Sequence, residues 1–170
     1  RELRRAIITA PASVRSVGEA VMAADRLLET AKAQADAQVS ERNAREKAEL
    51  MRQLGMDEGE SATKASRTMI RQLEEDQKRR SKRALTDAID RALIDLLAIY
   101  RDVLMVQVGG DGELINTDLS DLVHEIAQDS TPRQTLARVD HIETARKRLV
   151  SNGNPLLVLE DMAISLRPQA

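Results

Sequence analysis

The sequence predicts an all-α fold, a helical bundle of about five helices with a long antiparallel charged helical hairpin. The first observation is composition: the 170 residues include 7 Gly, 4 Pro, one Tyr, no Phe and no Trp. Strands need aromatic and β-branched residues to cover their faces, and the aromatic ones are nearly absent. The second observation is periodicity, because apolar residues recur at spacings of three and four over long stretches, as they do on one face of a helix.

Charge and residue usage exclude several classes of protein. The formal net charge is −2, from 26 basic and 28 acidic residues, which argues against a domain that mainly holds nucleic acid electrostatically. Cysteine is absent, so disulfides, thiolate zinc sites and cysteine nucleophiles are excluded. No apolar stretch approaches the roughly 20 residues of a membrane-spanning helix. We therefore expect a cytoplasmic protein with no membrane contact.

The first half of the chain predicts a short helical end followed by a long helix. Residues 1–12 read as the end of a preceding helix, broken at Pro11, and a linker; the domain proper is expected over 13–170. Ser13 is the predicted N-cap of a helix that ends at Gly55. Its expected core face is a stripe of small or apolar residues: Val14, Val17, Val21, Ala24, Leu28, Ala31 and Ala35.

A second long helix is predicted from about Lys64 to Val108, after a loop over 55–63. Its first half is polar and its second half is the most apolar part of the chain. A helix that is apolar over so wide an arc is typically central in a bundle. Residues 36–82 are therefore expected to form a protruding polar hairpin whose base joins the core.

Three shorter helices are predicted after glycines 109, 110 and 112 close the long one. Each begins at a residue whose side chain can cap a helix. The expected caps are Asn116 or Thr117, Thr131 and Asn154. Proline follows two of them, at positions 132 and 155, where a first-turn proline is favourable. Pro168 is expected to terminate the last helix.

The motifs of catalysis and metal binding are missing from the sequence. The glycine cluster at 109–112 is followed by Glu113 and lacks the lysine of a phosphate-binding loop. His124 and His141 lie 17 residues apart without a companion at ligand spacing. We expect no cofactor, no metal site and no small-molecule substrate, although an enzyme with an unrecognised site between helices stays an alternative.

A basic run at 78–83 raises the alternative of a nucleic-acid-binding helical module. Five of its six residues are Lys or Arg. Six consecutive residues spread around the whole circumference of a helix, however, and the acidic residues 74–76 offset much of their field. No aromatic side chain is near for base stacking. A solvated charged face is the favoured interpretation, with DNA contact at most indirect.

The second half of the chain, about residues 83–167, resembles the C-terminal domain of bacterial clamp-loader delta-prime subunits. The resemblance is carried by several segments in the family's order: Asp87-Ala88-Ile89-Asp90-Arg91-Ala92-Leu93, Tyr100-Arg101-Asp102-Val103-Leu104, Leu114-Ile115-Asn116-Thr117-Asp118-Leu119, and Asn152-Gly153-Asn154-Pro155. Family members commonly carry a larger apolar or small residue where Gly153 stands. Related gamma/tau subunits share the architecture, so a gamma/tau-type collar is a close alternative.

This resemblance implies an oligomerisation role. Clamp loaders of DNA polymerase III are rings in which ATPase-type domains hang from a collar of packed helical domains. The chain would supply a collar domain without catalysis, with gamma/tau and delta subunits as its partners. The candidate interface residues are Tyr100, Arg101, Leu104, Asn152, Asn154 and Leu159. For Asn154, which precedes Pro155, helix capping is the favoured role.

Overall fold

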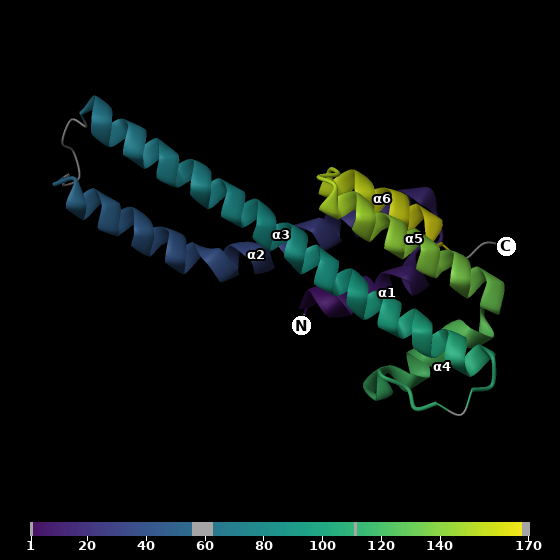
Figure 1. Cartoon of the computed structure of the whole chain (residues 1–170). Coiled ribbons are helices and arrows are strands. Elements are labelled where there is room, and N and C mark those ends of the chain that lie inside the picture. The colour runs from purple at the N-terminus through teal and green to yellow at the C-terminus, as the bar shows by residue number, and fades with distance from the viewer. Residues whose placement is uncertain (1, 56–62, 111, 168–170) are drawn as a thin grey trace. The chain divides into compact units, whose positions relative to one another are not determined.

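The computed structural model describes residues 2–55, 63–110 and 112–167, which form six α-helices and one 3₁₀ turn without any strand (Figure 1). This confirms the predicted all-α class. The elements are α1 (Glu2–Ser13), α2 (Val17–Gln53), α3 (Lys64–Gln107), η1 (Thr117–Leu119), α4 (Ser120–Gln128), α5 (Pro132–Val150) and α6 (Pro155–Ser165).

The chain divides into two compact units. The first, called unit 1 here, comprises Arg1–Ala31 and Ile89–Ala170; the second, unit 2, comprises Lys32–Ala88. Unit 2 therefore contains the whole of the hairpin predicted at 36–82. Helix α1, which spans most of the segment expected to be the end of a preceding helix and a linker, belongs to unit 1, in which Leu3, Ile7 and Ile8 are buried.

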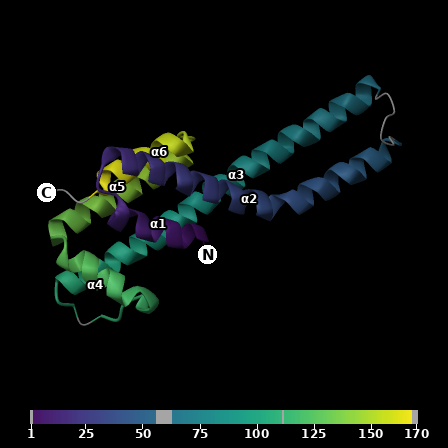
Figure 2. The same cartoon turned by 180° about the vertical axis from the view of Figure 1, so that it is seen from behind.

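The core of unit 1 is built around the second half of α3. Its wide apolar arc, predicted to be central, is buried at several successive turns: Leu93, Leu96, Ile99, Tyr100 and Val103. Helices α5 and α6 run side by side in both views of the molecule (Figures 1 and 2) and add their own buried residues to this core. Full burial of each large aliphatic side chain contributes about 1.5–3 kcal/mol, so this arc is the main stabilising feature of the unit.

Five of the seven residues predicted for the core face in and just before α2 are buried: Val14, Ala24, Leu28, Ala31 and Ala35. Val17 and Val21 are exposed, and the residues that face the core are mainly alanines: Ala20, Ala23, Ala24 and Ala31, with Leu27 and Leu28. Small side chains let two helix backbones approach closely, which explains why the alanine face is the one that packs. Val17 and Val21, in the first turns of α2, stay on the surface.

The boundary between α1 and α2 also differs from the prediction. Helix α1 continues through Pro11 to Ser13, although a proline at this place removes a backbone donor and crowds the carbonyl group four residues earlier. The N-cap of α2 is Ser16 rather than Ser13. Ser16 Oγ accepts from the Glu19 backbone N–H at 3.1 Å, and Glu19 Oε2 accepts from the Ser16 N–H at 3.0 Å. This reciprocal pair is a capping box.

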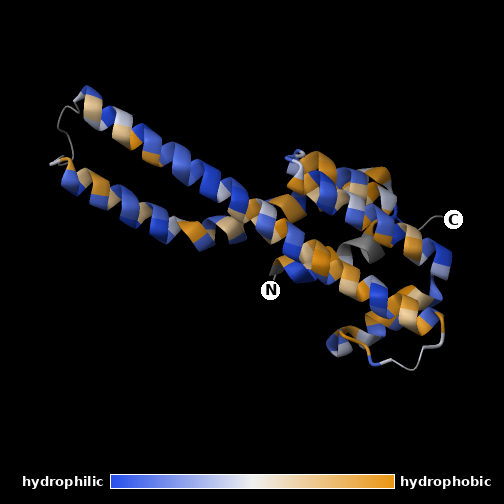
Figure 3. Cartoon of the chain, in the orientation of Figure 1, coloured by the Kyte–Doolittle hydropathy of each residue, from blue (hydrophilic) through white to orange (hydrophobic). Residues whose placement is uncertain are grey.

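Unit 2 consists of parts of α2 and α3, which form an antiparallel pair. Ala35, Val39 and Ala84 are buried together, with Leu85 packed against them. Beyond this cluster the two helices are joined by polar bonds, such as Gln77 Nε2 to the Asn43 carbonyl oxygen at 2.8 Å. Hydrophilic residues dominate the unit 2 part of α3 (Figure 3). The predicted loop over 55–63 lies largely outside the described residues.

Two helices end in the same left-handed turn. After α3, Gly109 has φ +66° and the Gly110 N–H donates to the Met105 carbonyl oxygen at 3.0 Å. After α5, Asn152 has φ +62° and the Gly153 N–H donates to the Arg148 carbonyl oxygen at 2.8 Å. Both patterns are Schellman motifs, which satisfy carbonyl groups at the helix end.

Gly153 is fitted to its turn. A Cβ atom at this position would lie 2.7 Å from the Arg148 carbonyl oxygen, which no real contact allows. Helix α6 ends at Ser165 with Leu166 as its C-cap. Pro168, the predicted terminator, lies outside the described residues.

Candidate subunit interface

Two of the predicted interface residues are enclosed by the chain itself. Tyr100 and Leu159 each expose 1 % of their surface, so neither side chain is available to a partner. Their helical spacing suited either a core or an interface, and the core is where they lie. The Arg138 guanidinium stands 5.9 Å from the Tyr100 ring centroid, a cation–π contact. Burial raises the pKa of Tyr100 to about 12, and its hydroxyl has no hydrogen-bond partner among the described residues.

Arg101 and Leu104 lie nearer the surface. Arg101 is exposed, and its Nη1 donates to Asp102 Oδ1 at 2.8 Å and to the Glu113 carbonyl oxygen at 3.3 Å. Leu104 is half-buried. Arg101 therefore ties the segment that follows α3 back onto the helix, while Leu104 leaves part of its side chain for a neighbour.

Asp102, which sequence reasoning did not single out, is a fully buried carboxylate. Its oxygens accept from the Asn116 backbone N–H at 2.8 Å, Asn116 Nδ2 at 2.9 Å and the Ile115 N–H at 3.1 Å, besides Arg101. Burial alone would raise the pKa of Asp102, but the hydrogen bonds from Asn116, Ile115 and Arg101 outweigh it and hold the pKa below its ordinary value. The carboxylate thus fixes the chain between α3 and α4.

Asn116 has a different role from the predicted one. Its side chain makes no capping hydrogen bond to η1, and the Thr117 side chain makes none to α4, whose N-cap position is occupied by Leu119. Asn116 instead donates to Asp102 and accepts from Arg4 Nη2 at 2.9 Å. Arg4 Nε lies 3.7 Å from Asp95 Oδ2, and Arg4 Nη1 lies 3.8 Å from Asp118 Oδ2. The Asn116 side chain, although well suited to capping, is bound by Asp102 instead.

The turn between α5 and α6 places the last two predicted residues on the surface. Asn154 Oδ1 accepts from the Leu156 N–H at 3.0 Å and the Leu157 N–H at 3.4 Å, which confirms its capping role. Asn152 supplies the left-handed conformation described above. Both are exposed, and the turn that carries them is fixed by hydrogen bonds at each end. The capping box of α5, between Thr131 and Gln134, confirms the other predicted cap.

Exposed apolar residues flank this turn. Val150, at the end of α5, exposes 73 % of its surface, and Leu157, in the first turns of α6, exposes 61 %. We call Val150, Asn154 and Leu157 the turn patch. Sequence reasoning missed Val150 and Leu157 because each adjoins buried apolar neighbours. The run Leu156–Leu159 is the available signal, since four successive apolar residues cannot all face one side of a helix.

The two histidines considered as metal ligands, His124 and His141, lie on different helices. His124 contacts the Ser120 carbonyl oxygen of its own helix at 2.7 Å, and His141 is exposed on α5. Among the described residues no group of three or more His, Asp or Glu is placed to hold a metal ion. None of the described helices combines the length and the apolarity needed to cross a membrane.

The basic run at 78–83 does not form one cationic face. Arg79 pairs with Asp76, and Arg80 Nη1 bonds to Glu46 Oε2 at 2.8 Å across the helix pair. Hydrogen bonds from Arg80, and then from Arg42, lower the pKa of Glu46 to about 2. Part of the run therefore holds the hairpin together instead of facing an external anion.

Comparison with known proteins identifies the family. Residues 60–167 match the family described as DNA polymerase III, delta subunit, C terminal. The chain belongs to this family. It is also 36 % identical over 72 residues to DNA polymerase III subunit delta' of Bacillus subtilis (strain 168); the match covers 42 % of the chain and 22 % of that relative. No solved structure matches.

This membership confirms the resemblance to delta-prime C-terminal domains that the sequence segments indicated. The match starts at residue 60, so it includes all of α3 and the turn between α5 and α6. The first 59 residues, with α1 and α2, lie outside it. The chain spans about a fifth of the length of the delta' relative.

Proposed function

We propose that the chain is the oligomerisation (collar) domain of a delta-prime-type clamp-loader subunit. It helps to hold the clamp-loader ring together while the sliding clamp is loaded during DNA replication. Its partners are the helical domains of gamma/tau-type and delta-type subunits. Family membership supports the class of protein, and the turn patch is the observation that supports an interface.

The turn patch has the properties of a binding surface. Val150 and Leu157 each expose a large apolar side chain within four residues of the polar Asn154, and apolar cores with polar groups are typical of stable interfaces. The Schellman motif and the Asn154 cap order the turn before any partner arrives. A preordered surface loses little conformational entropy on binding, so more of the contact energy appears as affinity.

The proposal assigns the chain no catalytic step. It needs no cofactor, metal or small-molecule substrate, and its contact with DNA is indirect, through the assembled ring. A cytoplasmic location follows from the same role. The exposed predicted residues Arg101, Leu104 and Asn152 are assigned to the rim of the interface. The buried Tyr100 and Leu159 support it from within the bundle.

Co-purification with the C-terminal domains of gamma/tau and delta from the same organism tests the proposal. Light scattering should give the mass of a defined hetero-oligomer. The variants Val150→Glu and Leu157→Glu should each weaken assembly at least tenfold, because losing about 1.5–3 kcal/mol of apolar burial corresponds to about ten- to a hundredfold in affinity. Met69→Glu, an equally drastic change of an exposed apolar residue in unit 2, is the matched control and should assemble normally.

Two results would contradict this assignment. One is a stable monomer that binds neither partner at micromolar concentration. The other is a hetero-oligomer whose mass and affinity are unaffected by the substitutions at Val150 and Leu157. The gamma/tau-type alternative makes a separate prediction, since such a domain should also assemble with further copies of itself.

A further inference from the structure

The outer face of α3 in unit 2 carries a line of positive charge. Arg67, Arg71, Lys78 and Lys82 are all exposed. At about 100° per residue, all four positions lie within about 60° of the helix circumference. We call these four residues the cation stripe. It extends over about 22 Å, because each residue of a helix adds about 1.5 Å.

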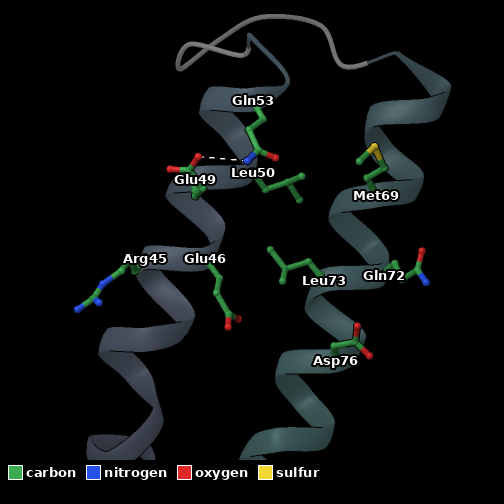
Figure 4. A pocket seen from close by; sticks show the side chains of 9 residues that line it. All are labelled: Arg45, Glu46, Glu49, Leu50, Gln53, Met69, Gln72, Leu73 and Asp76. Carbon is green, nitrogen blue, oxygen red and sulfur yellow. Dashed lines mark hydrogen bonds between the residues drawn. The ribbon is translucent and has the colours of Figure 1, made fainter.

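The inner face of α3, which packs on α2, is a different one. Its buried or half-buried residues recur at helical spacing, turned about 130° from the centre of the cation stripe; they include Ser66, Ile70, Leu73, Gln77, Arg80 and Ala84. Leu73 of this face points toward Leu50 of α2, into a hollow of about 530 Å³ between the helices (Figure 4). No residue of the cation stripe lines this hollow, so the stripe faces outward from the hairpin.

The positive charge of unit 2 is concentrated on α3. Residues 64–88 of α3 contain 8 Lys or Arg against 4 Asp or Glu, a net charge of +4. Residues 32–53 of α2 contain 5 against 4, a net charge of +1. The stripe includes only two residues of the basic run at 78–83, and its one-sidedness comes from spacing that extends back to Arg67.

The acidic residues beside the stripe do not cancel its charge. Both are already paired: Glu74 Oε1 lies 3.1 Å from Lys47 Nζ of α2, and Glu75 Oε1 lies 3.2 Å from Arg71 Nε. Arg67 and Lys78 have no ion-pair partner among the described residues. At least these two cations can therefore meet an external anion without breaking a bond of the hairpin.

We propose that the cation stripe binds the phosphate backbone of a nucleic-acid duplex without sequence preference. A DNA duplex carries one negative charge about every 1.7 Å along its axis, so a straight line of cations about 22 Å long can meet several phosphates. Release of counterions drives such binding, and no apolar contact is required. The collar role needs only an indirect contact with DNA, and the stripe adds a direct one in unit 2.

Three other anionic partners fit the stripe less well. A stable protein interface needs an apolar centre, but the other exposed residues near the stripe are polar or charged: Thr68, Gln72, Glu74, Glu75 and Arg79. Stable attachment to a membrane surface needs apolar side chains for the same face to insert. Single-stranded nucleic acid is held by stacking on aromatic side chains, and unit 2 contains none.

The test is fluorescence anisotropy of a labelled DNA duplex of mixed sequence, titrated with the full chain at several salt concentrations. Contacts with two to four phosphates predict that log affinity falls with log salt with a slope of about −2 to −4. Arg67→Gln combined with Lys78→Gln should reduce the magnitude of this slope by about 2. The same double variant should weaken binding at least tenfold at about 30 mM salt.

The matched control removes the same charge from the other helix of the hairpin. Arg45 and Arg52 are exposed residues of α2, and Arg45→Gln combined with Arg52→Gln should change neither the slope nor the affinity. Acetylation of lysines gives an independent readout. Bound duplex should slow acetylation of Lys78 and leave unchanged the rate at Lys147, an exposed lysine of α5 in unit 1. Circular dichroism confirms that each variant is folded.

Several outcomes would overturn the proposal. Failure to bind the duplex at about 30 mM salt, or a slope near zero, would exclude the phosphate contacts. Equal losses in the two double variants would show that the total charge of unit 2, and not the stripe, determines binding. Displacement of the duplex by polyglutamate at equal charge would assign the stripe to an acidic protein. Tighter binding of a single strand than of the duplex would assign it to single-stranded nucleic acid. None of these readouts depends on assembly through the turn patch.

Discussion

Replacing Asp102 with asparagine tests the buried junction between α3 and α4. The carboxylate accepts four hydrogen bonds, from Arg101, from the Ile115 backbone and from the backbone and side chain of Asn116. An asparagine keeps one acceptor oxygen and turns an NH₂ group toward the other donors. About two charge-assisted bonds are then lost, each contributing about 1.5–3 kcal/mol, and the lower desolvation cost of the amide offsets part of the loss.

We expect Asp102→Asn to lower the free energy of unfolding by about 3 kcal/mol. For a chain of this length that corresponds to a fall in Tm of about 6–12 °C. Urea unfolding followed by far-UV circular dichroism at pH 7 measures the change. Asp118→Asn is the matched control, since Asp118 is an exposed aspartate in the same segment whose ion pair with Arg4 is 3.8 Å long. It should change stability by no more than about 0.5 kcal/mol.

The effect of pH gives a second check on the same reasoning. The pKa of Asp102 is lower in the folded chain than the value of about 3.9 for an unfolded aspartate. Its ionisation therefore stabilises the fold fully above that pH, and this stabilisation is lost as the pH falls through the folded pKa. The difference in the free energy of unfolding between the unchanged chain and Asp102→Asn should be constant above about pH 5. It should become smaller below about pH 4. A difference under 1 kcal/mol at pH 7, or one that widens with acid, would refute the account.

Three further expectations concern local structure. Thr131→Ala removes the capping box of α5 and should cost about 1 kcal/mol in urea unfolding, whereas Thr131→Ser should cost little. Gly153→Ala places a methyl group 2.7 Å from the Arg148 carbonyl oxygen and should lower Tm measurably; an unchanged Tm would mean that the turn relaxes freely. In an NMR titration Glu46 should have a pKa of about 2, and Arg80→Gln should raise that pKa toward its ordinary value. If Arg80→Gln left the pKa of Glu46 unchanged, the Arg80–Glu46 ion pair across the two helices would be absent in solution.

Features set by neighbouring residues could be predicted from the sequence. Thr131 before Pro132 and Asn154 before Pro155 form caps because donor and acceptor lie within three residues of each other. The apolar second half of α3 was correctly placed in the core, since a helix apolar over a wide arc has to be covered. The polar hairpin was recognised from the weakness of its apolar stripe.

Features set by partners distant in the sequence could not be predicted. Asn116 looks like a cap, but Asp102, 14 residues earlier, binds its side chain. Val17 and Val21 follow the same helical periodicity as the buried Ala24 and Leu28, so only packing decides which residues of the stripe are covered. For the interface, spacing could not tell the buried Leu159 from its exposed neighbour Leu157, because both lie in one continuous apolar run.

The contacts of Asn116 constrain how the sequence can change over evolution. Its amide group serves Asp102 of α3 and Arg4 of α1 at once, so a substitution at Asn116 removes a hydrogen bond from each of the other two residues. Changes at such positions are strongly non-additive. Among relatives of this chain, positions 4, 102 and 116 should therefore vary together, and an alignment rich enough to detect correlated substitutions should show the 102–116 pair more strongly than the 4–116 pair.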